Sequence, residues 1–249
     1  MWHEPTGPIA GKARKAVKSR TPRTPLPPEW TYSQALERFR HEFKDGFQDE
    51  RYAIRERDWK WAKHDLWLET VGPEGFRALA AASPAKAAAL IEATIYTKSP
   101  MLDPRSEIVT LRDALQKPES AGAYFTALAD LLEAPEVTSK LFDSHLQALT
   151  SLPLAGSGNL EKWTILTIIP FFAQPSRHMF LKPRRTKEIV RRLGKDIHYA
   201  ARPKWDTYER LLAFSNELLE VLKPQGAQDM IDVQSFIWAI TGSDDSAAE

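Results

Sequence analysis

Prolines divide much of this chain into segments with helical periodicity. Pro73, Pro84, Pro104, Pro118 and Pro135 each precede or open a run in which apolar residues recur at i, i+3 and i+4. Proline is favoured in the first turn of a helix, because its missing N–H would have no partner there. We therefore predict that each of these prolines begins a helix. Their spacing is uneven, so the sequence establishes no repeat of fixed period.

Helical patterning continues over nearly all of the chain from Trp30 onward. Side chains that can accept a hydrogen bond from the first turn of a helix stand ahead of several runs. These predicted caps are Thr31 or Ser33, Asn159, Thr186, Asp206 and Asp229. The run WTILTII after Asn159 is apolar nearly all round and is predicted to be buried. Because no segment shows a convincing hairpin signal, the predicted fold is all-α, with roughly ten helices in a globular or irregular helical-stack domain.

The ends of the chain differ in composition from its middle. Residues 1–28 contain six prolines and six Lys or Arg residues against one Glu. Few apolar side chains are present there to offset the entropy lost on ordering, so we predict a disordered, basic, proline-rich arm. The loop at 155–159 contains two glycines and separates a predicted N-terminal helical layer, residues 29–154, from a C-terminal one with a basic helix, residues 155–242. Residues 243–249 are predicted to form an acidic tail.

Composition excludes several classes of protein. The chain has no cysteine, which rules out disulfides, thiolate metal sites and cysteine nucleophiles. Its longest apolar run, residues 163–173, is far shorter than the about 20 residues needed to cross a bilayer. The N-terminus lacks the apolar stretch of a secretory signal. We therefore expect a cytoplasmic protein without a transmembrane segment.

Positive charge is concentrated in one part of the C-terminal half. Residues 177–204 contain ten Lys or Arg residues against two acidic ones, and Arg184, Lys187 and Arg191 follow one another at i+3 and i+4 steps. A solvated helix face usually interleaves opposite charges, and this one scarcely does. An anionic partner explains the excess better than an ordinary surface does. The residues assigned to nucleic-acid contact are Arg177, Lys182, Arg184, Arg185, Lys187, Arg191, Arg192 and Lys195.

Three tryptophans stand close together in DWKWAKHDLW, at Trp59, Trp61 and Trp67. On a helix, Trp59 and Trp61 point in different directions, so at least one of them is expected at the surface or at an interface. Large aromatics most often anchor a core, and they are also frequent in protein interfaces. Both interpretations stay open, and the three tryptophans are the candidate residues for contact with a protein partner.

Sequence motifs for catalysis are absent. The chain has no GxGxxG, no GxxxxGK[ST] and no pair of histidines at HxH or HExxH spacing. We therefore expect no metal, no cofactor and no enzymatic activity. The alternative of an enzyme whose site is assembled from distant residues stays open, with His64, His178, Glu56 and Asp58 as its candidates.

The C-terminal part of the chain, from FFAQPSRHMFLKP at 171–183 to DMIDVQSFIW at 229–238, resembles a family of bacterial proteins that end in nearly the same phrase. No activity or catalytic residue is known for that family, so the resemblance implies only a bacterial, cytoplasmic source. The closing phrase also has a structural explanation. Asp229 can cap a helix, and Phe236, Ile237 and Trp238 would pack that helix into the core.

These patterns favour a non-enzymatic protein that contacts the phosphates of nucleic acid through the basic residues, helped by the basic arm. In the alternative hypothesis, the same residues dock an acidic protein partner while the tryptophans form an apolar contact. The enzyme is the third hypothesis. Charge reversal among the basic residues should abolish binding under the first two hypotheses and need not affect the third.

Overall fold

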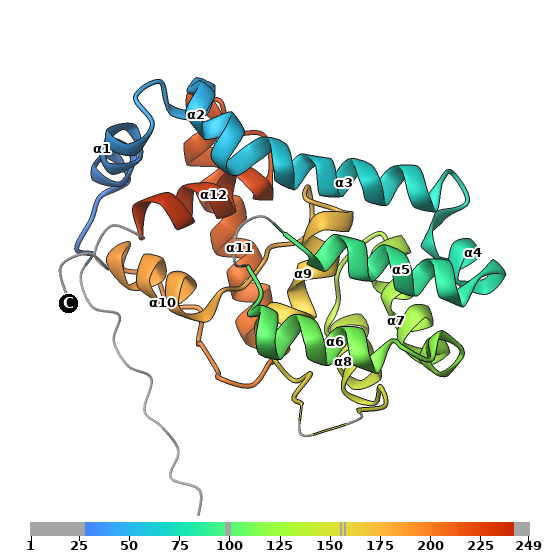
Figure 1. Ribbon diagram of the computed structural model, residues 1–249. Coiled ribbons are helices and arrows are strands. Elements are labelled where there is room, and N and C mark those ends of the chain that lie inside the picture. The colour runs from blue at the N-terminus through green and yellow to red at the C-terminus, as the bar shows by residue number, and fades with distance from the viewer. Residues whose placement is uncertain (1–27, 98–100, 155, 157, 242–249) are drawn as a thin grey trace, which may run out of the picture.

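The computed structural model of this protein describes residues 28–97, 101–154, 156 and 158–241 (Figure 1). Within these ranges every regular element is a helix and no strand occurs, which confirms the predicted all-α fold. The predicted N-terminal arm, except for Pro28, and the predicted acidic tail lie outside the described residues. No helix in the described part of the chain is both long and apolar enough to cross a membrane.

In the described part of the chain, α-helices are interspersed with shorter 3₁₀ and π-helical turns. The α-helices are α1 (Tyr32–Glu42), α2 (Glu50–Tyr52), α3 (Asp58–Val71), α4 (Gly75–Ala82), α5 (Pro84–Ile95), α6 (Val109–Ala114), α7 (Gly122–Glu133), α8 (Ser139–Thr150), α9 (Trp163–Ala173), α10 (Pro183–Arg192), α11 (Trp205–Leu222) and α12 (Met230–Ile240). The 3₁₀ turns are η1 (Gly46–Gln48), η4 (Pro118–Ala121) and η5 (Lys223–Gln225), and the π-helical turns are η2 (Ala53–Arg57) and η3 (Pro104–Ile108).

The prolines open helices at three of the five predicted places. Pro84, Pro104 and Pro118 are the first residues of α5, η3 and η4. Pro73 lies two residues before α4, and Pro135 lies four residues before α8. The prediction at Pro135 is wrong because Thr138 supplies a better start: its hydroxyl accepts the backbone N–H of Leu141 at 3.4 Å.

A long helical rod made of α2, η2 and α3 runs along one edge of the molecule (Figure 1). The Asp49 side chain caps this rod by accepting the backbone N–H of Arg51 at 2.9 Å. The π-helical turn η2 adds a residue to one turn and so changes which side chains of the following turns face the core. The rod ends at Gly72, whose φ of 61° lies in the left-handed region where glycine is favoured.

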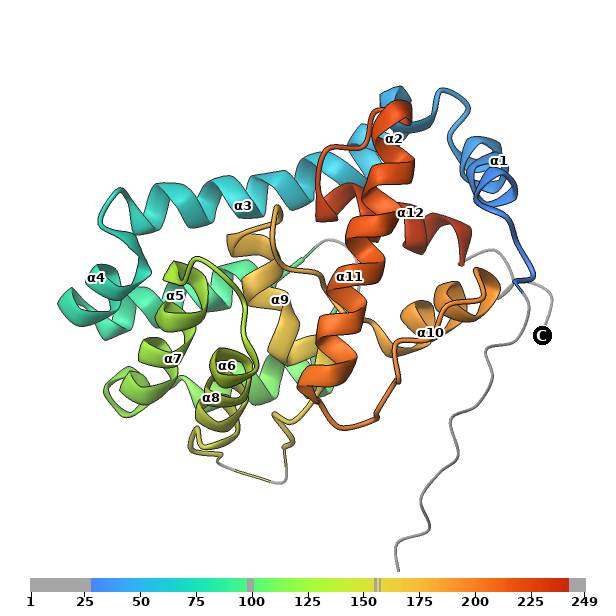
Figure 2. The ribbon, with the colours of Figure 1, turned by 180° about the vertical axis from the view of Figure 1, so that it is seen from behind.

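Helix α9 lies at the centre of the fold, with every one of its residues buried, as its sequence predicts. It packs against α3, α5, α7 and α8 (Figures 1 and 2). The predicted cap is wrong, because α9 begins at Trp163 and not directly after Asn159. The Asn159 side chain instead accepts the backbone N–H of Glu161 at 2.8 Å, which stabilises a turn ahead of the helix.

The C-terminal helices pack against the N-terminal ones around one core. Helix α12 contacts α1, α10, α11 and η2, and nearly all of its residues are buried. The backbone N–H groups of Glu29 and Trp30 both donate to the carbonyl of Arg192 at 2.8 Å, which fixes the start of α1 beside the end of α10. Figure 2, the view from behind, shows α11 (Trp205–Leu222) in the foreground, running down the molecule from beside α12. Helices of the two predicted layers therefore share a single hydrophobic core.

Of the three predicted caps that follow Asn159 in the chain, one is confirmed. Asp229 caps α12 by accepting the backbone N–H groups of Ile231 at 2.7 Å and Asp232 at 3.3 Å. Helix α10 begins three residues before Thr186, at Pro183, because proline is preorganised for the first helical position. Helix α11 begins at Trp205, so Asp206 lies in its first turn instead of capping it.

Candidate functional site

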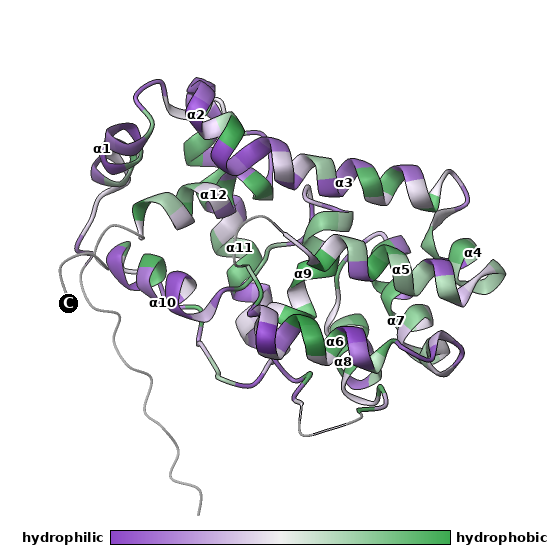
Figure 3. Cartoon of the chain, in the orientation of Figure 1, coloured by the Kyte–Doolittle hydropathy of each residue, from purple (hydrophilic) through white to green (hydrophobic). Residues whose placement is uncertain are grey.

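The outer side of α10 is uniformly basic. The only exposed side chains of this helix are Arg184, Lys187 and Arg191, and all three are cations. The other side of the helix buries Ile189 and Val190. In Figure 3 the hydrophilic residues gather on α1, on α10 and at the start of the long rod. We name Arg184, Lys187 and Arg191 the basic face of α10.

Intramolecular contacts anchor the end of the basic helix. Arg191 and Arg192 both form ion pairs with Glu29, and Arg192 also pairs with Glu188 at 3.5 Å. The guanidinium of Arg192 lies 4.8 Å from the centroid of the Trp30 ring. The one acidic residue of α10, Glu188, thus pairs with Arg192 outside the basic face, and the one ion pair described above for the basic face is that of Arg191 with Glu29.

Three other predicted phosphate contacts have protein partners. Lys195 donates from Nζ to Glu217 at 2.5 Å. Lys182 donates from Nζ to the carbonyl of Met101 at 2.7 Å, and burial lowers the pKa of its ammonium group. Arg185 donates to the carbonyl of Thr241, and its guanidinium lies 4.7 Å from the centroid of the Trp238 ring. These side chains help to position α10, in addition to the charge they contribute.

A hollow lies at the N-terminal end of the basic face, with a volume of about 500 Å³. Its charged lining consists of Lys162, Lys182, Arg184, Arg202, Glu107 and Glu161. Lys162 lies 3.8 Å from Glu107, and Arg202 lies 3.8 Å from Glu161. Cations thus outnumber carboxylates in the hollow, which extends the positive surface beyond α10.

The tryptophans of the long rod are mainly core residues. The exposed fraction is 7% for Trp59 and 3% for Trp67. The indole of Trp59 donates to the carbonyl of Arg55 at 2.9 Å, and Trp67 stacks on Phe76 with 5.2 Å between ring centroids. Of the three, only Trp61 is half-buried. The predicted apolar contact with a protein partner is therefore reduced to Trp61, because the other two rings are occupied by packing.

A second hollow is a groove of about 830 Å³. It lies between α3, α4, the end of α7 and the turn that follows α9. Its apolar walls come from Trp67, Leu68, Val71, Phe76 and Leu132. Its polar lining includes Trp61, His64, Glu133, Gln174, Arg177 and Asp229. The turn after α9 is joined to the start of α12 by a hydrogen bond from the Met230 N–H to the Pro175 carbonyl, at 2.9 Å.

Arg177 belongs to this groove and not to the basic face of α10. One terminal nitrogen lies 3.5 Å from the carbonyl of Leu132 and 3.4 Å from Oε1 of Gln174. The other terminal nitrogen is buried and has no hydrogen-bond partner. The grouping of Arg177 with the basic helix in the sequence is thus corrected, because the tight turn at Gln174 directs the two segments to different sides of the molecule.

His64 lies in the same groove, and one of its ring nitrogens already forms a hydrogen bond within the protein. Its Nδ1 is 2.9 Å from the carbonyl of Phe172, so Nδ1 carries a proton and donates to that carbonyl, and in the neutral tautomer Nε2 is the acceptor. The other candidates for an enzyme lie elsewhere. His178 is fully buried beside Tyr208, Glu56 is buried against Lys60, and Asp58 is exposed. None of these three lines the groove, so the four predicted residues do not form one site.

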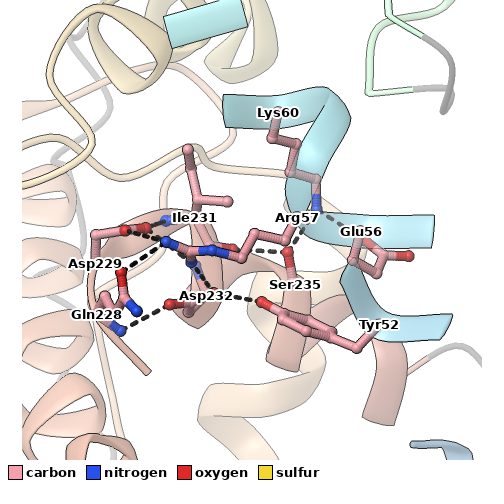
Figure 4. Close-up of polar contacts among 9 residues, drawn as sticks. All are labelled: Tyr52, Glu56, Arg57, Lys60, Gln228, Asp229, Ile231, Asp232 and Ser235. Carbon is pink, nitrogen blue, oxygen red and sulfur yellow. Dashed lines mark hydrogen bonds and ion pairs between the residues drawn. The ribbon is translucent and has the colours of Figure 1, made fainter. Parts of the chain in front are cut away.

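An ionic network is buried next to the groove, between the long rod and α12 (Figure 4). Asp232 has 1% of its side chain exposed and forms an ion pair with Arg57. It also accepts the Tyr52 hydroxyl at 2.5 Å and the Gln228 backbone N–H at 2.7 Å. Burial raises the pKa of Tyr52 well above its ordinary value, and the nearby Asp232 adds to the shift. Asp229 joins the network at 3.4 Å from Arg57, and its pKa is raised by burial and by Asp232.

A second buried ion pair lies beside this network (Figure 4). The ammonium group of Lys60, with 1% of its side chain exposed, donates to Glu56 at 2.8 Å and to the Ser235 hydroxyl at 2.7 Å. Ser235 in turn donates to the carbonyl of Ile231 at 2.7 Å. Burial lowers the pKa of Lys60, while Glu56 opposes that shift. Every charged group in this part of the interior has a partner, which indicates a structural role.

Among the described residues, no group of three or more His, Asp or Glu side chains is arranged to hold a metal ion. No protein-family model matches the chain, and comparison with curated proteins and with solved structures also finds no match. Two surfaces therefore remain as candidates: the basic face of α10 with its adjoining hollow, and the groove that contains Arg177.

Proposed function

We propose that the protein binds nucleic acid through its phosphates, by means of the basic face of α10. The observation that carries this proposal is that Arg184, Lys187 and Arg191 are the exposed residues of α10 and that all three are cations. They span about 10 Å of the helix axis. A nucleic-acid duplex presents about six negative charges over that length.

The packing of α10 supports this proposal. The helix is fixed by its buried apolar side and by the ion pairs to Glu29, so the basic face is held in place before a ligand arrives. Preorganisation of this kind reduces the entropy lost on binding. The adjoining hollow adds Lys162 and Arg202 to the surface that a phosphate backbone could follow.

The expected binding is nonspecific. Contacts to phosphates position a protein on nucleic acid and carry no direct sequence information. Because α10 buries Ile189 and Val190 in the core, its outer side alone is available, and that side offers no residue besides the three cations. Affinity should therefore depend on ionic strength far more than on base sequence.

The charge-reversed variant Arg184→Glu/Lys187→Glu tests the proposal. Wild-type protein should bind labelled duplex and single-stranded DNA and RNA with a log Kd that changes with log salt by about 2 to 3, as neutralising about three phosphates requires. The variant should bind at least tenfold more weakly at low salt and show a smaller slope. Arg191 is left unchanged because it pairs with Glu29, so that reversing its charge would also change an intramolecular contact.

The matched control is Lys117→Glu/Lys140→Glu. It alters net charge by the same amount at two exposed lysines outside α10 and should leave binding unchanged. Equal losses in both variants would indicate a response to overall charge and not to the basic face. If the wild-type protein does not bind nucleic acid at low salt, the proposal is overturned. Binding to polyglutamate, a model of an acidic protein surface, would then favour an acidic protein partner.

A further inference from the structure

We infer that the groove between α3, α4, α7 and the turn after α9 binds a small molecule that carries a carboxylate on an apolar body. Arg177 is the residue that receives the carboxylate. This site is separate from the basic face of α10 and does not depend on the proposed binding of nucleic acid.

The size and walls of the groove fit such a ligand. Its volume of about 830 Å³ lies within the range of small-molecule sites, roughly 300 to 1,000 Å³. Trp67, Leu68, Val71 and Phe76 provide apolar surface on one side. Sites of this kind combine mostly apolar walls with a few polar groups that fix the orientation of the ligand.

Arg177 lacks a counter-charge in the groove. Its hydrogen bonds at 3.4 and 3.5 Å reach the side-chain amide of Gln174 and the backbone carbonyl of Leu132, which are both neutral. Its second terminal nitrogen is buried and makes no hydrogen bond. A charged donor without a partner is costly in a protein, so this guanidinium is suited to receive an anion.

The carboxylates that border the groove are held by other cations. Glu133 accepts from Arg77 at 2.8 Å, and Asp229 lies 3.4 Å from Arg57 while it also caps α12. Neither forms an ion pair with Arg177. Their presence disfavours a ligand of high negative charge, such as a phosphate dianion, because like charges would repel it. A single carboxylate matches the single guanidinium in charge and in planar geometry.

Two further polar groups line the same groove. The indole nitrogen of Trp61 is buried and has no hydrogen-bond partner, so it is a second donor without an acceptor. The Nδ1 of His64 donates to the carbonyl of Phe172, so the neutral tautomer of this ring offers Nε2 as an acceptor. The Trp61 and His64 rings pack edge to face with 4.9 Å between centroids, which fixes the orientation of both. A carboxylate with a nearby hydroxyl or N–H donor would suit this set.

The test uses three apolar carboxylates, namely octanoate, 3-phenylpropanoate and naphthalene-2-carboxylate, each beside its primary amide. Binding to the full chain is measured by ligand-observed NMR and titration calorimetry. We expect at least one acid to bind about tenfold more tightly than its amide, since the amide keeps the apolar body and loses the charge-assisted hydrogen bond. If no acid is preferred over its amide, the inference is wrong.

The variant Arg177→Gln tests whether Arg177 is responsible for the preference for the acid over its amide. This variant should bind the acid about tenfold more weakly and bind the amide as the wild type does, so that the preference disappears. A merely structural role for Arg177 would weaken acid and amide equally, and that result would overturn the inference. Arg184→Gln, on the basic face of α10, is the matched control and should keep the full preference for the acid.

Leu68→Glu provides a second test that does not touch Arg177. Leu68 lines the groove with half of its surface exposed, so its replacement should not disturb folding. A carboxylate introduced there competes for Arg177 and repels the ligand, and the preference for the acid should be lost. An unchanged preference in this variant would place the binding outside the groove and contradict the inference.

Discussion

Replacing Asp232 by alanine is expected to lower the free energy of unfolding by about 3 to 5 kcal/mol. Asp232 is almost fully buried and is the shared acceptor for Arg57, Tyr52 and the backbone of Gln228. Its removal leaves a half-buried guanidinium whose one remaining carboxylate contact is the longer one to Asp229, beside its bond to Gln228. It also leaves the Tyr52 hydroxyl without its acceptor inside the core. Chemical denaturation followed by circular dichroism measures the change.

Asp206→Ala is the matched control for this prediction. Asp206 also accepts from two side chains, Arg210 at 2.9 Å and His198 at 2.9 Å, but more than half of its own side chain is exposed. Exposed ion pairs contribute little, so this change should cost less than about 1 kcal/mol. If the two variants lose equal stability, burial of the network does not have the effect that we assign to it.

Asp232→Asn separates charge from hydrogen bonding. Asparagine keeps an oxygen that can accept from Tyr52, and it removes the negative charge that faces Arg57. We expect its stability to lie between those of the wild type and the alanine variant. A loss equal to that of alanine would assign the whole effect to the ion pair.

Stability is expected to fall by about 4 kcal/mol between pH 7 and pH 5, because of two buried histidines. Burial lowers the pKa of His145 to about 4 and that of His178 to about 3. The unfolded chain takes up both protons near pH 6.5, while the folded protein keeps both rings neutral. The unfolded state therefore binds more protons in this range, and acid favours it. Each histidine contributes about 1.4 kcal/mol for each pH unit below 6.5.

The surroundings of both rings explain why the folded protein resists protonation. His145 stacks on Tyr124, His178 lies 3.2 Å from the Tyr208 hydroxyl, and neither ring has a carboxylate partner. Asp229 acts in the opposite sense, because its raised pKa lets the folded protein bind a proton first. The stabilising contribution of Asp229 grows toward lower pH. The change in the free energy of unfolding between pH 7 and pH 5 therefore reports mainly on the two histidines.

Denaturant titrations at pH 7, 6 and 5 measure the stability, and histidine NMR spectra report the charge of the rings. The signals of His145 and His178 should remain those of neutral imidazole at pH 5. Stability that does not change over this range, or two rings that titrate near pH 6.5, would contradict the assignment of both shifts to burial.

Local sequence signals predicted the helices well where the decisive groups lie within a few residues of each other. Asp229 and Thr31 cap helices because their acceptors face N–H groups two or three residues further on. The apolar character of α9 predicted its burial for the same reason. The errors arose where two local signals competed, as at Pro183 and Thr186, where the proline determined the start of α10.

The candidate sites could be predicted only in part. The spacing of Arg184, Lys187 and Arg191 placed them on one face of a helix, and their exposure agrees with that placement. The same stretch of sequence placed Arg177 with them, although it lies in the groove beside Leu132. No sequence signal identified the groove, because its lining comes from segments far apart along the chain.

The sequence by itself determined the all-α class, most helix positions and the basic face of α10, since these depend on periodicity and on contacts within one or two turns. Only the tertiary structure decided which charges are buried and which stay exposed. Lys60 reaches Ser235 and Arg57 reaches Asp232 across 175 residues of sequence. Such pairs form when helices pack, because the interior of the protein then excludes water and each buried charge requires a partner.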